Sequence, residues 1–288
     1  MGKKHKKISY GPHDFPWGPE PYIRKGNLGL NIDEAHKNIV LTLANAFADG
    51  KQSIPSQLTD RFDIKNQDVR LNFINYGDTQ LVYLATFENG TKLTTLINQP
   101  HTPLGRVKRE FTNLKRMVQI DSRFVVEPFS YFAMEEAGHE LYVSQYVDNA
   151  MCVAVNGNHG VYDPLPNYHF EEFSPEMSLE VNSSMIALLV KYYDEERQKG
   201  LAKTQVSGND FILTRDFNKT NPSTILPNMK LISARDFVNT SLDGYLDMLR
   251  QEFLIGTNYD SGVINARSKM PMTKREIEIG IEKGLLLR

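Results

Sequence analysis

The chain has 288 residues and a formal net charge of -2, and 40% of its residues are hydrophobic and 24% charged. This composition is typical of a globular protein with a sizeable core, and the small net charge gives no global attraction to nucleic acid or to an anionic membrane. Cys152 is the only cysteine, which excludes an internal disulfide and a cysteine-based metal cluster. Because there is no apolar run of membrane-spanning length and no apolar signal sequence, we expect a cytoplasmic protein without a membrane span.

Residues 1–66 are expected to form an N-terminal arm followed by a helix. Four lysines lie between Lys3 and Lys7, and this basic tail is either a solvated terminus or a contact to the phosphates of nucleic acid or lipid. The prolines between residues 8 and 22 forbid a regular helix there and favour an extended segment. Asn31 or Asp33 can cap a helix that ends at Gly50.

Residues 67–148 are predicted to be rich in strands, with one helix. Apolar and polar residues alternate over 69–74, 80–87 and 92–97, and Asn89-Gly90 is a strong hairpin signal between the last two segments. The spacing of apolar residues predicts a helix over 107–118. Two further strands are predicted over 124–128 and 140–147.

Residues 149–288 are predicted to be mainly helical. The segment from 148 to 174 is expected to be irregular, and a long helix is expected over 178–199, with Gly200 as its stop. The pattern then predicts strands over 211–213 and 229–234 and a helix over 242–253. Thr273 and Glu276 form a capping box that opens a last helix.

The order of three strands, one helix and two strands, followed by a mainly helical region, resembles the protein kinase and aminoglycoside phosphotransferase superfamily. The resemblance covers roughly residues 69–253. It implies an α+β, two-lobed protein kinase-like fold with residues 67–148 as the small lobe and 149–288 as the large lobe. Only about fifty residues follow Asp236, so the resemblance implies a shortened C-terminal lobe, preceded in the chain by the N-terminal helical arm.

The resemblance also implies where a nucleotide would bind. In the family, a glycine-rich turn covers the phosphates, and here Gly77 is the only glycine of that turn. Leu96 stands where the family has its phosphate-binding lysine, and Lys92 lies on the same face of the strand. Glu110 corresponds to the glutamate that pairs with that lysine; without the lysine it is either a solvated residue or paired with an arginine. Tyr146 lies in the segment that would receive the adenine.

Residues 200–213 correspond to the catalytic loop of the family. Gln205 occupies the position of the catalytic aspartate and cannot act as a general base, because an amide does not take up a proton usefully. In the same register Asp210 replaces an asparagine and is a candidate magnesium ligand. A second register reads Ser207-Gly208-Asn209-Asp210 as a degraded His-Gly-Asp motif, which makes Asp210 catalytic and Asp216 a candidate ligand.

The second metal position of the family is an aspartate that opens a D-F-G triplet. Ser233 stands at that point, and Asp236-Phe237 follows three residues later. Asp236 is therefore either a second metal ligand, brought in by a small bulge, or a helix cap or salt-bridge residue.

Two classes of function follow from the resemblance. The first is a degenerate pseudokinase that binds a nucleotide or an unidentified protein or small-molecule partner. The alternative is a divergent phosphotransferase that uses ATP and Mg²⁺, held by Asp210 and Asp236, to modify a small molecule or a protein hydroxyl. We do not expect nucleic acid as a partner; a role of this kind would rest on the lysine tail alone.

Overall fold

The computed structural model describes residues 8–9, 58, 61–64, 67, 69–76, 80–99, 102–134, 138–156, 158–163, 169–202, 210–214, 216–218, 220–253 and 272–288. The described chain is α+β, as the sequence predicts, and its sheets are largely antiparallel. Most of the arm and helix predicted over 1–66 lies outside the described residues. Among the helices that the structure describes, none combines the length and the apolar character that crossing a bilayer requires.

The chain divides into two compact units. The first unit comprises residues 1–108, 128–146 and 165–167, and the second comprises residues 109–127, 147–164 and 168–288. Helix α4 (Arg106–Ile120) begins in the first unit and continues in the second. Most of this helix therefore belongs with the C-terminal part of the chain, whereas the sequence had grouped it with residues 67–148.

The first unit contains a six-stranded sheet in the order β1-β2-β3-β4-β6-β5. β1 runs parallel to β2, and the other neighbours are antiparallel. The strands are β1 (Ile8–Ser9), β2 (Val69–Tyr76), β3 (Gln80–Phe87), β4 (Lys92–Asn98), β5 (Pro128–Met134) and β6 (His139–Gln145). The strand expected over 124–128 is displaced, because Asp121 caps a 3-10 helix, η1 (Ser122–Phe124), and β5 begins after it.

The hairpin predicted at Asn89-Gly90 is present between β3 and β4. Gly90 has a φ of 85°, a left-handed conformation that glycine adopts without steric cost. The Asn89 side chain accepts a hydrogen bond from the Thr91 amide at 2.9 Å and donates one to the Phe62 carbonyl at 3.0 Å. The bond to Thr91 fixes the turn locally and so sets the register of β3 against β4, whereas the bond to Phe62 attaches the turn to the segment before β2.

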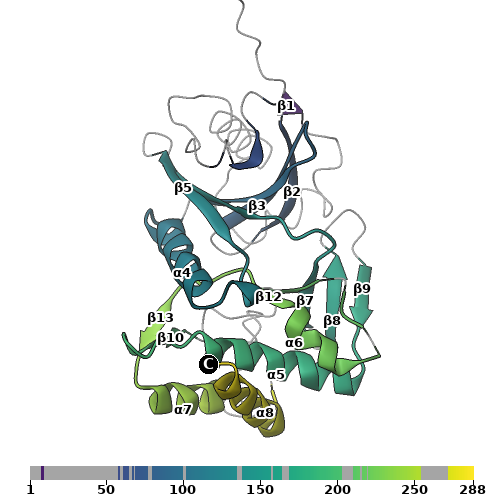
Figure 1. Ribbon diagram of the computed structural model, residues 1–288, viewed down its shortest axis with the longest axis vertical. Helices are drawn as coiled ribbons and strands as arrows, with labels where there is room; N and C mark the ends of the chain where they lie inside the picture. Colours follow the sequence, from purple (N-terminus) through teal and green to yellow (C-terminus); the bar gives the residue numbers. More distant parts are fainter. Residues whose placement is uncertain are drawn as a thin grey trace, which may run out of the picture. The chain divides into compact units, whose positions relative to one another are not determined.

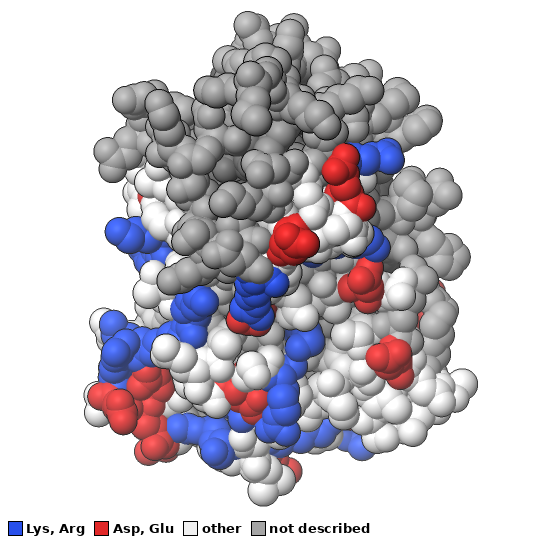
Figure 2. Space-filling view, turned by 45° about the horizontal axis from the view of Figure 1, so that its top comes forward, with Lys and Arg blue, Asp and Glu red and all other residues white. Residues whose placement is uncertain are grey.

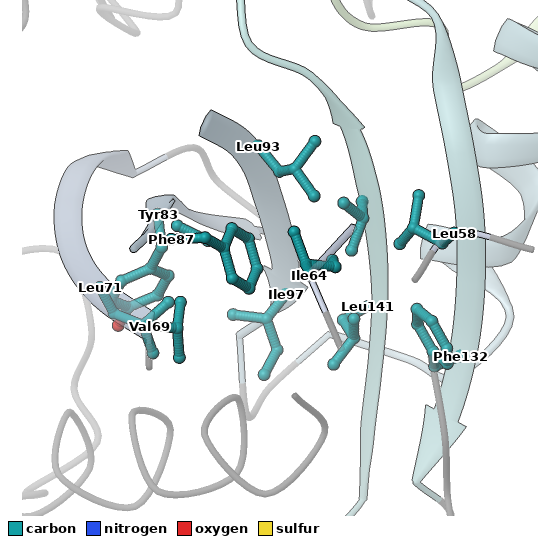
Figure 3. Packing of buried hydrophobic residues seen from close by; sticks show 12 residues of the cluster. Leu58, Ile64, Val69, Leu71, Tyr83, Phe87, Leu93, Ile97, Phe132 and Leu141 are labelled. Carbon is teal, nitrogen blue, oxygen red and sulfur yellow. The ribbon is translucent and has the colours of Figure 1, made fainter. Parts of the chain in front are cut away.

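The apolar faces of these strands form the core of the first unit (Figure 3). Leu71, Tyr83 and Ile97 come from three successive strands and are each at most 1% exposed. Burying a side chain of this size contributes about 1.5–3 kcal/mol each. Leu58 and Ile64, which precede β2, pack against the same cluster.

The second unit contains a five-stranded sheet in the order β12-β11-β7-β8-β9. Its strands are β7 (Met151–Asn156), β8 (Asn158–Asp163), β9 (His169–Glu172), β11 (Phe211–Leu213) and β12 (Met229–Leu231). The prediction of an irregular segment over 148–174 was therefore wrong. The asparagine, histidine and glycine residues of these short strands interrupt the alternation that marks a strand in sequence, and pairing with β11 supplies the order instead.

Helices α5 (Pro175–Lys191), α7 (Leu242–Phe253) and α8 (Lys274–Leu286) also belong to the second unit (Figure 1). α5 is shorter than predicted, because it ends at Lys191 with Tyr192 as its C-cap, and the chain then turns back through Gln198, whose φ is 51°. The capping box of α8 is present as predicted. Gly280 and Gly284 bring α8 against α5 so closely that an added Cβ at Gly280 would lie 2.5 Å from Ile186.

A separate two-stranded antiparallel sheet completes the second unit. In it β10 (Lys199–Leu201) pairs with β13 (Phe237–Asn239), while β11 and β12 pair within the five-stranded sheet. Between β11 and β12 lie a short 3-10 helix, η5 (Pro222–Thr224), and a single turn of helix, α6 (Ile225–Asn228). Because β12 and β13 pair with β11 and β10, the link over 232–236 is fixed at both ends, beside Asp210 and Ala202.

Candidate functional site

The candidate site lies entirely within the second unit, where helix α4 meets the link between β12 and β13. The Ile232 amide donates to the Asp210 carbonyl at 2.8 Å, and the Ala202 amide donates to the Asp236 carbonyl at 2.9 Å. From α4, the Asn113 side chain donates to the carbonyls of Ala234 and Arg235 at 2.8 and 3.2 Å. The link is therefore held by backbone atoms on both sides, which positions its side chains.

Four side chains form a continuous hydrogen-bonded chain at this place. The Arg235 Nη2 atom donates to Asp210 Oδ1 at 2.6 Å, which is also an ion pair. The Arg235 Nε atom donates to Ser233 Oγ at 3.0 Å. The Ser233 hydroxyl in turn donates to Glu110 Oε1 at 2.6 Å. The structure thus brings Glu110 and Asp210, which the sequence placed in one site, into a single polar network.

Both carboxylates of this network are buried. Glu110 is 0% exposed and Asp210 is 2% exposed, whereas the Arg235 side chain is 20% exposed. Of the two alternatives for Glu110, the solvated helix residue is therefore excluded. Withdrawing a carboxylate from water costs several kcal/mol unless hydrogen bonds and opposite charge compensate it. The Arg235 guanidinium supplies both, because it is permanently charged and presents several N–H donors in one plane.

Asp236 forms a separate ion pair. Its Oδ1 atom lies 3.2 Å from Arg109 Nη1 on helix α4, and the two side chains are 32% and 61% exposed. Asp236 therefore forms a salt bridge, which is one of the roles that its position in the sequence left open. An exposed pair of this kind contributes little to stability, about 0–1 kcal/mol.

The remaining candidate residues are distributed differently. Lys92 and Tyr146 belong to the first unit, where the Lys92 ammonium lies 5.4 Å from the centre of the Tyr146 ring. Lys92 is exposed, and Leu96 on the same strand is buried. Gly77 and Gln205 lie outside the described residues, as do residues 207–209 of the second register.

Sequence reasoning missed Arg235. The resemblance assigns Ser233 to the position of a metal-binding aspartate, but Arg235, two residues later, belongs to no motif. The register of β11 against β12 would have been the signal, since it pairs Phe211 with Leu231 and so places Asp210 beside the residues that follow β12. That register becomes visible only when the hairpin is known.

The two described aspartates of this site are both engaged in ion pairs. A general base needs a carboxylate that can accept a proton from a substrate, yet the described carboxylates of Asp210 and Asp236 each face a guanidinium. Among the residues that the structure describes, no group of three or more His, Cys, Asp and Glu side chains is arranged to hold a metal ion. The polar network presents the partly exposed guanidinium of Arg235 beside two buried carboxyl groups.

A second polar cluster lies elsewhere in the second unit, around Asp121. The Arg123 guanidinium donates to this carboxylate at 2.7 Å, and the Lys191 ammonium lies 3.0 Å from it. Hydrogen bonding from Arg123 holds the pKa of Asp121 well below its usual range. Burial raises the pKa of Tyr192, whose hydroxyl donates to the Asp121 carbonyl at 2.6 Å. Lys191 also donates to the Leu287 carbonyl, so the cluster is a structural junction.

The described surface carries charges of both signs. Figure 2 shows lysine and arginine side chains interspersed with aspartate and glutamate side chains on the face that it presents. The described part of this face is therefore not a uniformly basic surface, of the kind that attracts nucleic acid through its phosphates.

A scan against models of known protein families found no match for this chain, and a search of the curated proteins found no relative.

Proposed function

We propose that the chain is a degenerate kinase-like protein, a pseudokinase that binds a nucleotide or a partner without transferring a phosphoryl group. The observation that carries the proposal is the chain of contacts from Glu110 through Ser233 and Arg235 to Asp210. Glu110 and Asp210 occupy two positions to which the resemblance assigns a role. Glu110 corresponds to the partner of the phosphate-binding lysine, and Asp210 to a metal ligand. Here they are joined to each other by an arginine.

The order of the described elements supports the kinase-like fold. Strands β2, β3 and β4 are followed by helix α4 and then by β5 and β6, the sequence of elements on which the resemblance rests. The strand β11, which follows the loop that contains Gln205, is also present as predicted. A fold with two kinase-like lobes is the simplest interpretation of this order of elements.

The residues at the working positions support the absence of catalysis. Leu96, at the position of the phosphate-binding lysine, is an apolar residue buried in the sheet. Gln205 cannot act as the base, and Ser233 replaces a metal-binding aspartate while it donates a hydrogen bond to Glu110. Each replacement removes a charge on which phosphoryl transfer depends.

Thermal-shift titration with ATP and ADP tests the proposal, combined with a measurement of ATP hydrolysis and of phosphate transfer to added protein. A nucleotide that binds the native state raises the melting temperature progressively with its concentration. We expect such a shift with either nucleotide and no turnover. Steady phosphate transfer that Asp210→Asn abolishes would instead establish the divergent phosphotransferase, which the burial of an acidic residue at that position favours.

If millimolar ATP and ADP leave the melting temperature unchanged, nucleotide binding is excluded and the partner-binding form of the proposal remains. Arg109→Gln is the matched control for variants of the network, because it removes an arginine from the same helix and link but from an exposed pair. Its melting temperature and its response to nucleotide should equal those of the unmodified chain.

A further inference from the structure

We propose that the cluster around Asp121 is a binding site for a phosphate dianion, either free or carried by a small molecule as a phosphomonoester. The site is built by Arg123, Lys230 and Lys191, which belong to η1, strand β12 and the C-terminal end of α5 in the second unit. It uses none of the residues of the network around Arg235, so it is independent of the proposed function.

Three cationic side chains are grouped around a single carboxylate in this cluster. The Arg123 Nη2 and Lys191 Nζ atoms lie 2.7 and 3.0 Å from Asp121 Oδ2. Lys230 is the third cation: burial lowers the pKa of its ammonium, and the nearby charge of Asp121 acts in the opposite direction. The described side chains of the cluster thus carry an excess of two positive charges. A phosphate dianion matches this excess, because it carries nearly two negative charges at neutral pH.

The Lys230 ammonium is held in place by the backbone. Its Nζ atom donates to the Arg123 carbonyl at 2.7 Å, and no carboxylate of the described residues lies within ion-pair distance of it. An ammonium has three N–H donors, so this contact leaves two of them available. Lys230 is partly buried, and a partly buried cation costs free energy unless an anion compensates it. An anionic ligand beside Lys230 would provide that compensation.

Arg123 provides the exposed part of the site. Its side chain is 72% exposed, and its Nε and Nη2 atoms donate to Asp121 at 3.0 and 2.7 Å. Within the part of the chain that the structure describes, no atom accepts a hydrogen bond from its Nη1 atom. A guanidinium presents its N–H donors in one plane, in a geometry that fits the oxygen atoms of a phosphate group. The free edge of Arg123 is therefore suited to this ligand.

Backbone contacts fix these cations before a ligand arrives. The Arg123 amide donates to Asp121 Oδ1 at 3.0 Å, while the Arg123 carbonyl accepts from Lys230. The Val126 amide donates to the Leu231 carbonyl at 3.0 Å, which ties the segment after η1 to strand β12. A site whose donors are already positioned loses less conformational freedom when it binds.

The experiment is isothermal titration of the full chain with inorganic phosphate at neutral pH and constant ionic strength, with acetate as the monoanion for comparison. We expect saturable binding of phosphate and none of acetate. Lys230→Met and Arg123→Gln each remove one cation and should weaken phosphate binding by at least about tenfold. Arg250→Gln is the matched control, because Arg250 lies in the same unit but pairs with Glu278 and Asp247. Its affinity for phosphate should equal that of the unmodified chain within about a factor of two.

Asp121→Asn separates a role in binding from a role in folding. It removes the one carboxylate of the cluster, so the local positive charge increases and the affinity for phosphate should increase, although the folded chain loses stability. If Asp121 and its partners had only a structural role, the same substitution would not tighten phosphate binding. Unchanged or weaker binding by this variant contradicts the proposal.

Two further results would overturn the assignment. One is phosphate that binds no better than acetate, and the other is phosphate binding that Lys230→Met and Arg123→Gln leave unchanged, because the anion then binds elsewhere. If Lys230→Met does not fold, Arg123→Gln decides, since it changes an exposed side chain. Because phosphate alone is titrated, a failure to bind ATP leaves these outcomes unaffected.

Titration with O-phosphoserine distinguishes the two sources of the phosphate group. Binding that is more than about threefold tighter than that of inorganic phosphate indicates a phosphomonoester ligand. Equal or weaker binding indicates that free phosphate is the ligand.

Discussion

Two arginine–aspartate pairs lie on neighbouring elements of the second unit, yet their surroundings are very different. Arg235 and Asp210 meet at 2.6 Å with side chains that are 20% and 3% exposed, while Arg109 and Asp236 meet at 3.2 Å with side chains that are 61% and 32% exposed. The first pair is linked onward to Ser233 and Glu110. The second pair is an exposed salt bridge on the surface.

This difference shows that the residue types alone do not determine how much an ion pair contributes to folding stability. Water screens the exposed pair and solvates either partner when the other is removed. Water cannot replace the lost partner of the buried pair in this way, because the Asp210 side chain is only 3% exposed. The four predictions that follow test this contrast, beginning with the largest expected effect.

Replacing Arg235 by methionine should lower the free energy of unfolding by about 3–5 kcal/mol, because it leaves two buried carboxylates without this cation. Urea denaturation at neutral pH measures the change. A loss below about 1 kcal/mol would mean that the network is hydrated in solution, and the contrast with the surface pair would then disappear.

Asp121 offers an intermediate case, since its partners are an exposed arginine and a buried lysine, with 72% and 6% exposed side chains. We expect Asp121→Asn to cost about 2 kcal/mol at neutral pH, through weakened hydrogen bonds to charged donors. Because the pKa of Asp121 is lowered in the folded chain, this stabilisation is present above the pKa of the unfolded state, near 3.9. It is lost as the pH falls through the lower pKa of the folded state.

The measurement is a denaturation series of the unmodified chain and of Asp121→Asn between about pH 7 and pH 2. The difference between their free energies of unfolding should become smaller below about pH 4. A difference that stays constant with pH would show that the carboxylate charge has no part in the stabilisation.

Ser233→Ala should cost about 1–2 kcal/mol, because it keeps every charge of the network but removes the hydroxyl that links Arg235 to Glu110. Chemical denaturation of the single variant, and of the double variant with Arg235→Met, gives the coupling energy between the two residues. Additive losses of stability would indicate that the Ser233 hydroxyl does not couple Arg235 to Glu110.

Arg109→Ala should change the free energy of unfolding by less than about 0.5 kcal/mol, and raising the salt concentration should remove even that effect. The same denaturation series measures it. A loss of more than about 2 kcal/mol would place Arg109 in the same energetic class as Arg235 and remove the basis for using it as a control.

The parts of the fold that the sequence predicted are those with strong local signals. The alternating strands β2, β3 and β4, the Asn89-Gly90 turn and the capping box at Thr273 are each decided by residues close together in the chain. Strands β7, β8 and β9 were missed because they gain their order by pairing with each other and, through β7, with β11, about sixty residues away. The end of α5 was misplaced because Gly200 looked like a stop, although Gly200 lies in strand β10.

The candidate site was predictable in part for a similar reason. Glu110 and Asp210 were identified because a resemblance assigns a role to their positions, and the structure joins them in one network. The role of Arg235 depends on a contact with Asp210, which lies 25 residues earlier in the chain, and on a contact with Ser233, two residues earlier. No local sequence pattern predicts such contacts, so Arg235 could not be assigned to the site without the structure.

The two glycines of α8 have a consequence for finding relatives of this chain. A Cβ at Gly284 would lie 2.5 Å from Val190 and 2.8 Å from the Ala187 carbonyl, so any larger residue must push α8 away from α5. Gly280 is under the same constraint, one helical turn earlier. Proteins that share this architecture should therefore carry small residues at both positions, four apart and preceded by the Thr273–Glu276 cap, even where the rest of the sequence has diverged. Such a pattern is a physical search criterion that does not depend on overall identity.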